Sequence, residues 1–137
     1  VDCDWSSDVC SSDLGGVEHR MELIYQGVVQ GEISLERWVE TCSTSPARMF
    51  GMYPKKGIVA PGSDADILIW DPNSKTKIGI NDKHHMNMDH SSWEGFVVDG
   101  KVDTVLSRGS IVVENDKFTG KKGHGKFIKR GLCQYLN

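Results

Sequence analysis

The chain has 137 residues, 38% of them hydrophobic, and carries a formal net charge of −3 at pH 7. Its length suits one ordinary domain with its own core, and its weak negative charge gives no electrostatic case for nucleic acid or an anionic membrane as partner. No apolar run approaches the roughly 18 residues that a transmembrane helix needs, so the sequence predicts no membrane span.

The first 14 residues, VDCDWSSDVCSSDL, show neither helical nor strand periodicity, and they contain a near-duplication of Ser-Ser-Asp-Val as Ser-Ser-Asp-Leu. One reading is an acidic metal-binding arm that uses Cys3, Cys10 and the aspartates, but their spacing matches no zinc or calcium loop. The stretch also resembles the conceptual translation of a sequencing adapter. We therefore expect residues 1–14 to be an anomalous, artefactual leader without a selected function.

Three short amphipathic helices are predicted between residues 17 and 51. The first places four apolar residues on one face, Met21, Ile24, Tyr25 and Val28. Gly31 suits its end and Ser34 suits the N-cap of the second helix. The apolar face of that helix consists of Leu35, Trp38, Val39 and Cys42. Ser45-Pro46 is typical of a cap and first turn, so a third helix should begin there and end at Gly51.

The stretch KGIVAPGSDADILIWD, residues 56–71, leads from the helices into a sheet. Pro61-Gly62 favours a tight turn, and the apolar run Ile67 to Trp70 is typical of a strand covered on both faces. The segment Pro72 to Ser74 is predicted to reverse the chain, so that residues 76–80 pair back as a second strand. Residues 81–93 are polar and His-rich, which indicates a loop.

Two hairpins are predicted in the last third of the chain. Asp99-Gly100 lies between residues 96–98 and 101–102 and favours a two-residue hairpin turn. Arg108-Gly109 lies between two further apolar runs, 104–107 and 110–114, and Asn115-Asp116 would then turn the chain into Lys117-Phe118. These segments predict a small antiparallel or mixed sheet.

The carboxy-terminal tail is basic, because residues 117–130 contain six Lys or Arg and no acid. The glycines among them lack the strand-to-helix setting and the Lys-Ser/Thr pattern of a phosphate-binding loop. We therefore expect a solvated extension and no nucleic-acid partner. Five apolar residues would anchor it on a partner surface: Phe127, Ile128, Leu132, Tyr135 and Leu136.

Two motifs resemble the metal-dependent amidohydrolase superfamily. The turn Gly57-x-x-x-x-Gly62-Ser-Asp-Ala-Asp66, followed by an apolar strand, resembles the entry into the small β-domain of that superfamily. The segment HHMNMDHSSWEGF, residues 84–96, resembles the hydantoinase and dihydropyrimidinase branch. Gly16 to Arg20 is similar to the Pro-Gly-x-Glu-x-Arg segment of that branch. From about Gly16 to Leu136 the chain is similar to the carboxy-terminal part of such an enzyme.

The resemblance implies an α+β fragment with four parts. After the leader, residues 15–56 would be the last helices of an incomplete (β/α) barrel, and residues 57–120 the small β-sheet domain. Residues 121–137 would be an extended tail that makes oligomer contacts. In the family, strands from the amino terminus complete the small domain, so this fragment would leave sheet edges and helix faces uncovered.

The complete enzyme, by this resemblance, would open dihydropyrimidine or hydantoin rings to N-carbamoyl amino acids, using two divalent ions, usually zinc, and a carboxylated lysine. We expect no cofactor on this chain and no activity from it alone. An alternative is a dihydropyrimidinase-related assembly module without catalysis. Another amidohydrolase, such as an allantoinase or dihydroorotase, would also fit the Gly-Ser-Asp-Ala-Asp turn, but fits Ser-Ser-Trp-Glu-Gly-Phe less well.

No catalytic, substrate-binding or metal residue is assigned in this chain. His84 and His85 are adjacent and would point to opposite faces of a strand, so with Asp89 and His90 they more readily form a solvated loop than a metal site. The barrel motifs that carry the family's metal ligands, a His-x-His pair among them, are absent from the sequence. In the family, a substrate-contacting Asn precedes the Glu18 segment, and here that position falls in the leader.

Two further groups of residues could in principle carry chemistry, the cysteines and a polar pair at the first helix. Cys42 lies on an apolar helix face and Cys133 in the tail, so each is predicted to be an ordinary free thiol. Glu18 and Arg20 would form a polar anchor at the head of the first helix. Because the cysteines are scattered and no basic or apolar leader is present, we expect a cytoplasmic protein. By resemblance the complete protein would be a homo-oligomer, a dimer or tetramer, joined through the tail.

Overall fold

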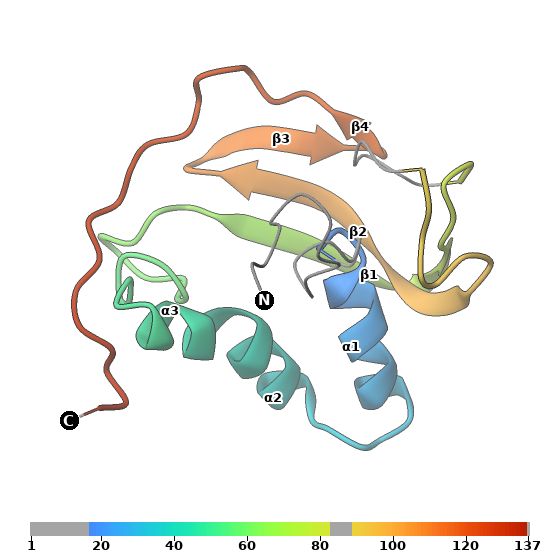
Figure 1. Ribbon diagram of the computed structural model, residues 1–137, viewed down its shortest axis with the longest axis horizontal. Helices are drawn as coiled ribbons and strands as arrows, with labels where there is room; N and C mark the ends of the chain where they lie inside the picture. The colour runs from blue at the N-terminus through green and yellow to red at the C-terminus, as the bar shows by residue number, and fades with distance from the viewer. Residues whose placement is uncertain (1–16, 83–88, 137) are drawn as a thin grey trace, which may run out of the picture.

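A computed structural model describes residues 17–82 and 89–136, which form a helical layer against one face of a four-stranded antiparallel sheet (Figure 1). The helices are α1 (Arg20–Val29), α2 (Leu35–Val39) and α3 (Ser45–Met49), with a π-helical turn, η2 (Glu40–Thr44), between the last two. The strands are β1 (Ile67–Lys77), β2 (Val97–Ser107), β3 (Ser110–Glu114) and β4 (Lys117–Phe118). They lie in the sheet in this same order, so β1 is an edge strand of the sheet that the described residues form.

The second and third predicted helices are one continuous helical segment. Ser34 caps it as predicted, because its hydroxyl accepts a hydrogen bond from Arg37 N at 3.2 Å. Helix α3 begins at Ser45 with Pro46 in its first turn, as predicted. Ser45 is not a non-helical cap, however, since its dihedrals are helical, φ −62° and ψ −46°, and α3 continues directly from η2. Pro46 has no N–H and its ring would collide with the carbonyl four residues back, and η2 widens the helix at this point. Helix and proline coexist because the turn before the proline is wider.

Strand β1 runs straight through the segment that was predicted to reverse it. Asp71 pairs with Lys101 and Lys75 with Asp99, so four steps along β1 face two along β2. The residues between them form an irregular bulge, which the Asp71 carboxylate holds by accepting a hydrogen bond from Asn73 N at 2.9 Å. The Pro-Asn-Ser signal therefore marks a bulge in a long strand, and residues 78–80 lie beyond its end.

Strand β2 also runs through a predicted turn, the Asp99-Gly100 dipeptide. Gly100 has φ +88°, as a hairpin glycine would, but it lies within β2 under the ring of Trp70. A Cβ at this position would lie 2.3 Å from Trp70 Cζ2, so glycine is required here for close packing as well as for its backbone conformation.

The two predicted turns that flank β3 are confirmed. Ser107 pairs with Ser110, and the residues between them, Arg108 and Gly109, have φ +47° and +78°. These positive values match the type I′ turn that the right-handed twist of a hairpin favours. The turn from β3 to β4 is of the same kind, with φ +51° at Asn115 and +59° at Asp116.

The helices dock on the sheet through three aromatic rings. Tyr25 of α1, Trp38 of α2 and Trp70 of β1 have ring centroids 4.9–5.1 Å apart, in edge or tilted contacts. Trp38 is 4% exposed, and its indole N–H donates to Met21 O at 3.2 Å. Trp38 therefore joins the two helices to each other and to the sheet.

A side-chain amide fixes α1 to β2. Gln26 Nε2 donates to Asp99 O at 2.9 Å, and Gln26 Oε1 accepts from Asp99 N at 3.1 Å. The amide thus pairs with the backbone of β2 as a neighbouring strand would. It satisfies both polar backbone groups of Asp99 at the point where the irregular pairing with β1 begins.

The tail after β4 crosses the end of the sheet and returns to α3 (Figure 1). On the way His124 contacts the β2–β3 turn: its Nε2 lies 3.0 Å from Ser107 O, and its carbonyl accepts a hydrogen bond from Arg108. Near its end Gly131 N donates to Gly51 O at 2.7 Å. The tail is an extension without helix or strand, as predicted, but it is held by its own chain at two places.

Candidate functional site

The acidic turn before β1 is an ion-pair cluster. Lys55 Nζ lies 2.6 Å from Asp64 Oδ1, and Lys56 Nζ lies 3.0 Å from Asp64 Oδ2 and also contacts Asp66. Asp66 in addition accepts a hydrogen bond from Arg108 N at 2.7 Å, which ties this turn to the β2–β3 hairpin. Both carboxylates of the Gly-Ser-Asp-Ala-Asp motif are thus engaged in holding the chain's own structure.

The electrostatics of this cluster favour the charged forms of Asp64 and Lys56. Hydrogen bonds from Lys55 and Lys56 hold the pKa of Asp64 below its ordinary value. Desolvation acts against the Lys56 ammonium, but its hydrogen bonds to Asp66 and Asp64 outweigh this and raise its pKa. An Asp with a lowered pKa and a Lys with a raised one are poor proton-transfer groups near neutral pH. The motif is therefore structural.

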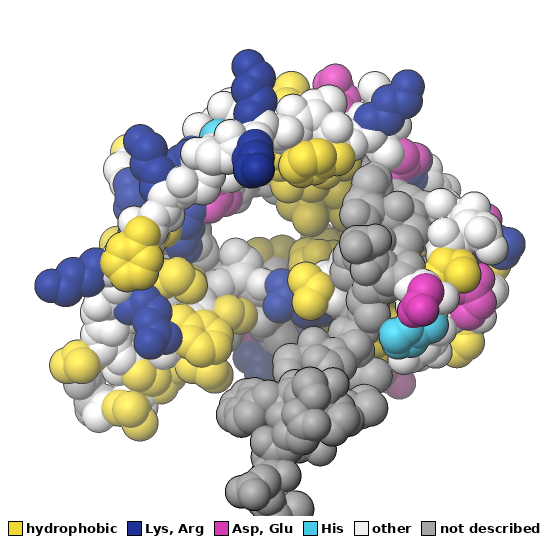
Figure 2. Space-filling view, turned by 45° about the horizontal axis from the view of Figure 1, so that its top comes forward, with side chains coloured by type: hydrophobic (Ala, Val, Ile, Leu, Met, Phe, Trp, Pro, Cys, Tyr) yellow, Lys and Arg dark blue, Asp and Glu magenta, His cyan; other side chains and the backbone are white. Residues whose placement is uncertain are grey.

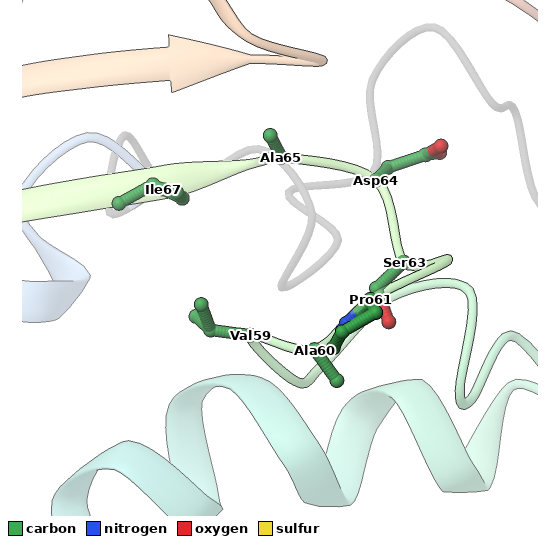
Figure 3. Close-up of a pocket in the computed structure, with 7 residues that line it drawn as sticks. All are labelled: Val59, Ala60, Pro61, Ser63, Asp64, Ala65 and Ile67. Carbon is green, nitrogen blue, oxygen red and sulfur yellow. The ribbon is translucent and has the colours of Figure 1, made fainter.

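The pocket beside this turn, about 280 Å³, has an apolar lining (Figure 3). It is lined by Val59, Ala60, Pro61, Ser63, Asp64, Ala65 and Ile67. Figure 3 shows the Asp64 carboxylate pointing away from Val59 and Ile67. Pro61-Gly62 forms the predicted turn, since Ser63 N donates to Ala60 O at 3.1 Å and Gly62 has φ +90°. The pocket brings no pair of acid and base together.

A larger hollow, about 520 Å³, lies between the helices and β1. Its wall contains the three docking aromatics together with Cys42, Val59 and Ile67. Burial raises the pKa of the Cys42 thiol, although the charge of Arg20 opposes this effect. The thiol therefore stays protonated at neutral pH and is a weak nucleophile. Cys42 is half-buried, as its predicted place on an apolar face requires, and Cys133 is also a free thiol.

A third cavity, about 240 Å³, contains the buried titratable side chains of the helical layer. His19 is 2% exposed and Glu22 is 3% exposed, and Leu68, Val105 and Val113 line the same space. The predicted polar anchor consists of their neighbours Glu18 and Arg20, but Arg20 is exposed. The spacing i, i+3 of residues 19 and 22 was a signal for a shared helix face, and it was missed because both residues are polar.

The His-rich loop lies partly outside the described residues, because His84 and His85 belong to the segment 83–88. His90 Nδ1 lies 2.9 Å from Asp89 Oδ1, and this pair is exposed, with a lowered pKa for Asp89 because of the hydrogen bond from His90. Within residues 17–82 and 89–136, no group of three or more His, Cys, Asp or Glu side chains could hold a metal ion. The described residues thus do not fit the two-metal centre that the resemblance implies for the complete enzyme.

The Ser-Ser-Trp-Glu-Gly-Phe segment is hydrogen-bonded to the residues that follow β1. Glu94 Oε2 accepts a hydrogen bond from Ile80 N at 3.0 Å, and Gly95 N donates to Ile78 O at 2.8 Å. A Cβ on Gly79 would lie 2.7 Å from Glu94 Oε1, so the glycine leaves room for the carboxylate. The glutamate of this motif therefore has a structural partner within the chain.

Across its described residues, the chain has no helix long and apolar enough to cross a membrane. The amidohydrolase family model matches residues 13–112. A D-hydantoinase from Streptomyces coelicolor is 53% identical over 123 residues, which are 90% of this chain and 26% of that protein.

Solved structures of proteins with related names are also similar to this chain. A D-hydantoinase superposes with a TM-score of 0.82 at 46% identity, covering 87% of this chain and 26% of its own. A dihydropyrimidinase from Brevibacillus agri superposes with a TM-score of 0.77, also at 46% identity, covering 80% of this chain and 24% of its own. The chain spans about a quarter of the length of these proteins.

Proposed function

Because the chain belongs to the amidohydrolase family, we propose that it is the carboxy-terminal part of a cyclic-amide hydrolase of the hydantoinase and dihydropyrimidinase type. The observation that carries this proposal is the 53% identity to a D-hydantoinase over 90% of the chain. The two solved structures described above are named as a D-hydantoinase and a dihydropyrimidinase, which agrees with this proposal.

The reaction of the complete protein would be the opening of a hydantoin or dihydropyrimidine ring. Water adds to the ring carbonyl carbon, the C–N bond breaks, and the ring nitrogen takes up a proton, which leaves an N-carbamoyl amino acid. Two divalent ions, usually zinc, with a carboxylated lysine would assist this step by resemblance. Their ligands would lie outside the described residues, in which no metal-binding cluster is found.

The part played by this chain would be structural. Residues 15–56 would close the barrel as its last helices, and residues 57–120 would form the small β-domain beside it. The ion-pair cluster at Asp64 and Asp66 supports this role, because it joins the helical part to the β2–β3 hairpin. The chain alone would then have no amidase activity, and the protein would act in the cytoplasm.

The complete protein would be a homo-oligomer, a dimer or tetramer, with its tail at a contact between subunits. Three apolar side chains of the tail support this proposal, since Phe127 is 94% exposed and Leu132 and Leu136 are each 85% exposed. Apolar side chains this exposed are typical of a surface that a partner covers.

A chimera tests the proposal. Residues 15–137 would replace the matching segment of the S. coelicolor D-hydantoinase, and release of N-carbamoyl product from hydantoin and dihydrouracil would be measured beside the intact relative and this chain alone. We expect the chimera to retain activity within about tenfold of the relative, which corresponds to about 1.4 kcal/mol of barrier, and the chain alone to have none.

Two results would contradict the proposal. Ring opening by the chain alone would mean that its own residues carry the chemistry. A chimera that folds, binds metal and remains inactive would instead favour the non-enzymatic assembly module.

A further inference from the structure

The end of helix α3 is in contact with the tail of the same chain over several backbone groups. Gly131 N donates to Gly51 O at 2.7 Å, and Gln134 N donates to Arg48 O at 3.1 Å. Gln134 Nε2 donates to Tyr53 O at 3.0 Å. The acceptors are backbone carbonyls at the carboxy-terminal end of the helix and in the turn after it, and Arg48 O accepts from Gly51 N at 3.2 Å as well.

The closest approach in this contact depends on one glycine. Gly51 has φ +66°, and a Cβ there would lie 2.2 Å from Gly131 O, the shortest such distance for any described glycine. Only Gly51 is required to be glycine for space, because a Cβ on Gly131 would lie 3.5 Å from Gly51 O, an ordinary contact. Gly51 therefore ends the helix and also opens the space that the tail backbone occupies.

Side chains add to the backbone contacts. Tyr135 Oη lies 3.2 Å from Ser45 Oγ, within hydrogen-bond distance. The Arg48 guanidinium stacks over the Tyr53 ring at 4.8 Å from its centroid. Hydrogen bonds to Tyr53 and then to Tyr135 raise the pKa of Arg48, so the guanidinium stays charged between the two phenol groups.

Between its two attachment points the tail makes no hydrogen bond to the rest of the described chain. Residues 125–130 run from the His124 contact to Gly131, and Lys126, Lys129 and Arg130 are exposed. Figure 2 shows Lys and Arg side chains spaced along this part of the surface, around an opening between it and the body. The attachment at α3 thus does not follow from general packing of the tail.

From these contacts we propose that the surface formed by Ser45, Arg48, Gly51 and Tyr53 is a peptide-docking site whose ligand is residues 131–135 of the same chain. It recognises an extended backbone, with the Gln134 amide and the Tyr135 hydroxyl as side-chain contacts. Its occupation closes residues 119–135 into a strap that joins the β2–β3 turn to the end of the helical layer. The outward apolar side chains of the strap remain available for a neighbouring subunit, and the site does not depend on the proposed function.

Hydrogen exchange of the full chain, followed by NMR, tests the site. The amides of Gly131 and Gln134 should be protected in the wild type. In Gly51→Ala they should exchange at least about tenfold faster, with core amides such as that of Val98 unchanged. Gly62→Ala is the matched control, because Gly62 also has positive φ but a Cβ there would meet nothing within 4 Å. In Gly62→Ala the amides of Gly131 and Gln134 should stay protected. In Gly131→Ala the amide of Gln134 should stay protected.

A second variant guards against a folding defect at Gly51. The double substitution Gln134→Ala with Tyr135→Phe leaves α3 intact, removes both side-chain contacts, and should speed exchange at Gly131 about threefold or more. Wild-type amides that exchange as in an unfolded peptide would overturn the site, as would full protection in Gly51→Ala. Protection that rises with protein concentration would overturn the assignment of the ligand to the same chain, in favour of a neighbour's tail.

Discussion

At the scale of single residues, this chain uses glycine and carboxylate positions to hold segments close together. Gly100 lies beneath Trp70, and Gly51 beneath the backbone of Gly131. Asp64 and Asp66 bind lysines that come from the other side of their turn. Motif residues that look like candidates for catalysis thus form ion pairs or close contacts within the chain. Substitutions at these residues should therefore first change the free energy of unfolding.

Substitution of Gly100 by Ala should destabilise the fold strongly. The new Cβ would lie 2.3 Å from Trp70 Cζ2 and 2.8 Å from Cε2, at a backbone φ of +88°. Overpacking and left-handed strain together should lower the free energy of unfolding by about 2–4 kcal/mol. Urea denaturation followed by Trp fluorescence measures this change. Gly109→Ala is the control, with φ +78° and nothing within 4 Å, and should cost about 1 kcal/mol; equal losses in the two variants would contradict the packing argument.

Substitution of Asp64 by Asn should change how stability depends on pH. The pKa of Asp64 is lowered in the folded protein by Lys55 and Lys56, so its contribution is fully present above its ordinary value of 3.8 and is lost as pH falls through the folded value. The variant should be less stable than the wild type at pH 7 and lose less stability below about pH 4. Urea midpoints from pH 7 to 2 test this, with Glu114→Gln as control. Parallel curves for wild type and Asp64→Asn would contradict it.

At the scale of elements, sequence reasoning succeeded where a turn signal had a single structural meaning. Arg108-Gly109 and Pro61-Gly62 form the predicted turns, and Ser34 caps its helix. It failed where the same signal serves two purposes. Asp99-Gly100 has the positive φ of a hairpin but belongs to a continuous strand, because Trp70 on the neighbouring strand occupies the space that a turn would leave open.

Other elements could not be predicted because distant residues determine them. The helix passes through Pro46 by way of a π-helical turn, which periodicity alone does not reveal. The side chains of His19 and Glu22 are buried because the sheet lies beneath them. The return of the tail to Gly51 joins residues about eighty positions apart, and only the folded structure brings them together.

At the scale of the whole molecule, the sheet that the described residues form ends at β1. Among the described residues strand β1 pairs with β2 alone, and Ile67, Leu68 and Trp70 of β1 line the apolar hollow together with Val59, which is 82% exposed. The proteins that match this chain are about four times as long. An apolar edge strand with an open hollow beside it is a surface prone to pair with another chain.

Self-association of this chain should therefore proceed through β1. Ile69, 49% exposed on this strand, is the position to change, and Ile69→Lys should weaken association about tenfold by placing a charge at the edge. Sedimentation velocity over a range of concentrations measures the effect. Ile111→Lys makes the same change at a similarly exposed site on β3, 45% exposed, and should have a smaller effect. If both substitutions weakened association equally, association would depend on exposed apolar surface in general, and the prediction for β1 would be wrong.

The way Gln26 holds β2 has a consequence for sequence divergence. Its amide bonds to the N–H and carbonyl of Asp99 and does not contact the carboxylate, which pairs with Lys75 at the surface. The joint between helix and strand is therefore indifferent to the side chain at position 99, because every residue except proline offers the same two backbone groups. Residues 75 and 99 can therefore change together in evolution as a surface pair. A change at position 26, in contrast, would remove the two hydrogen bonds that hold helix α1 to strand β2.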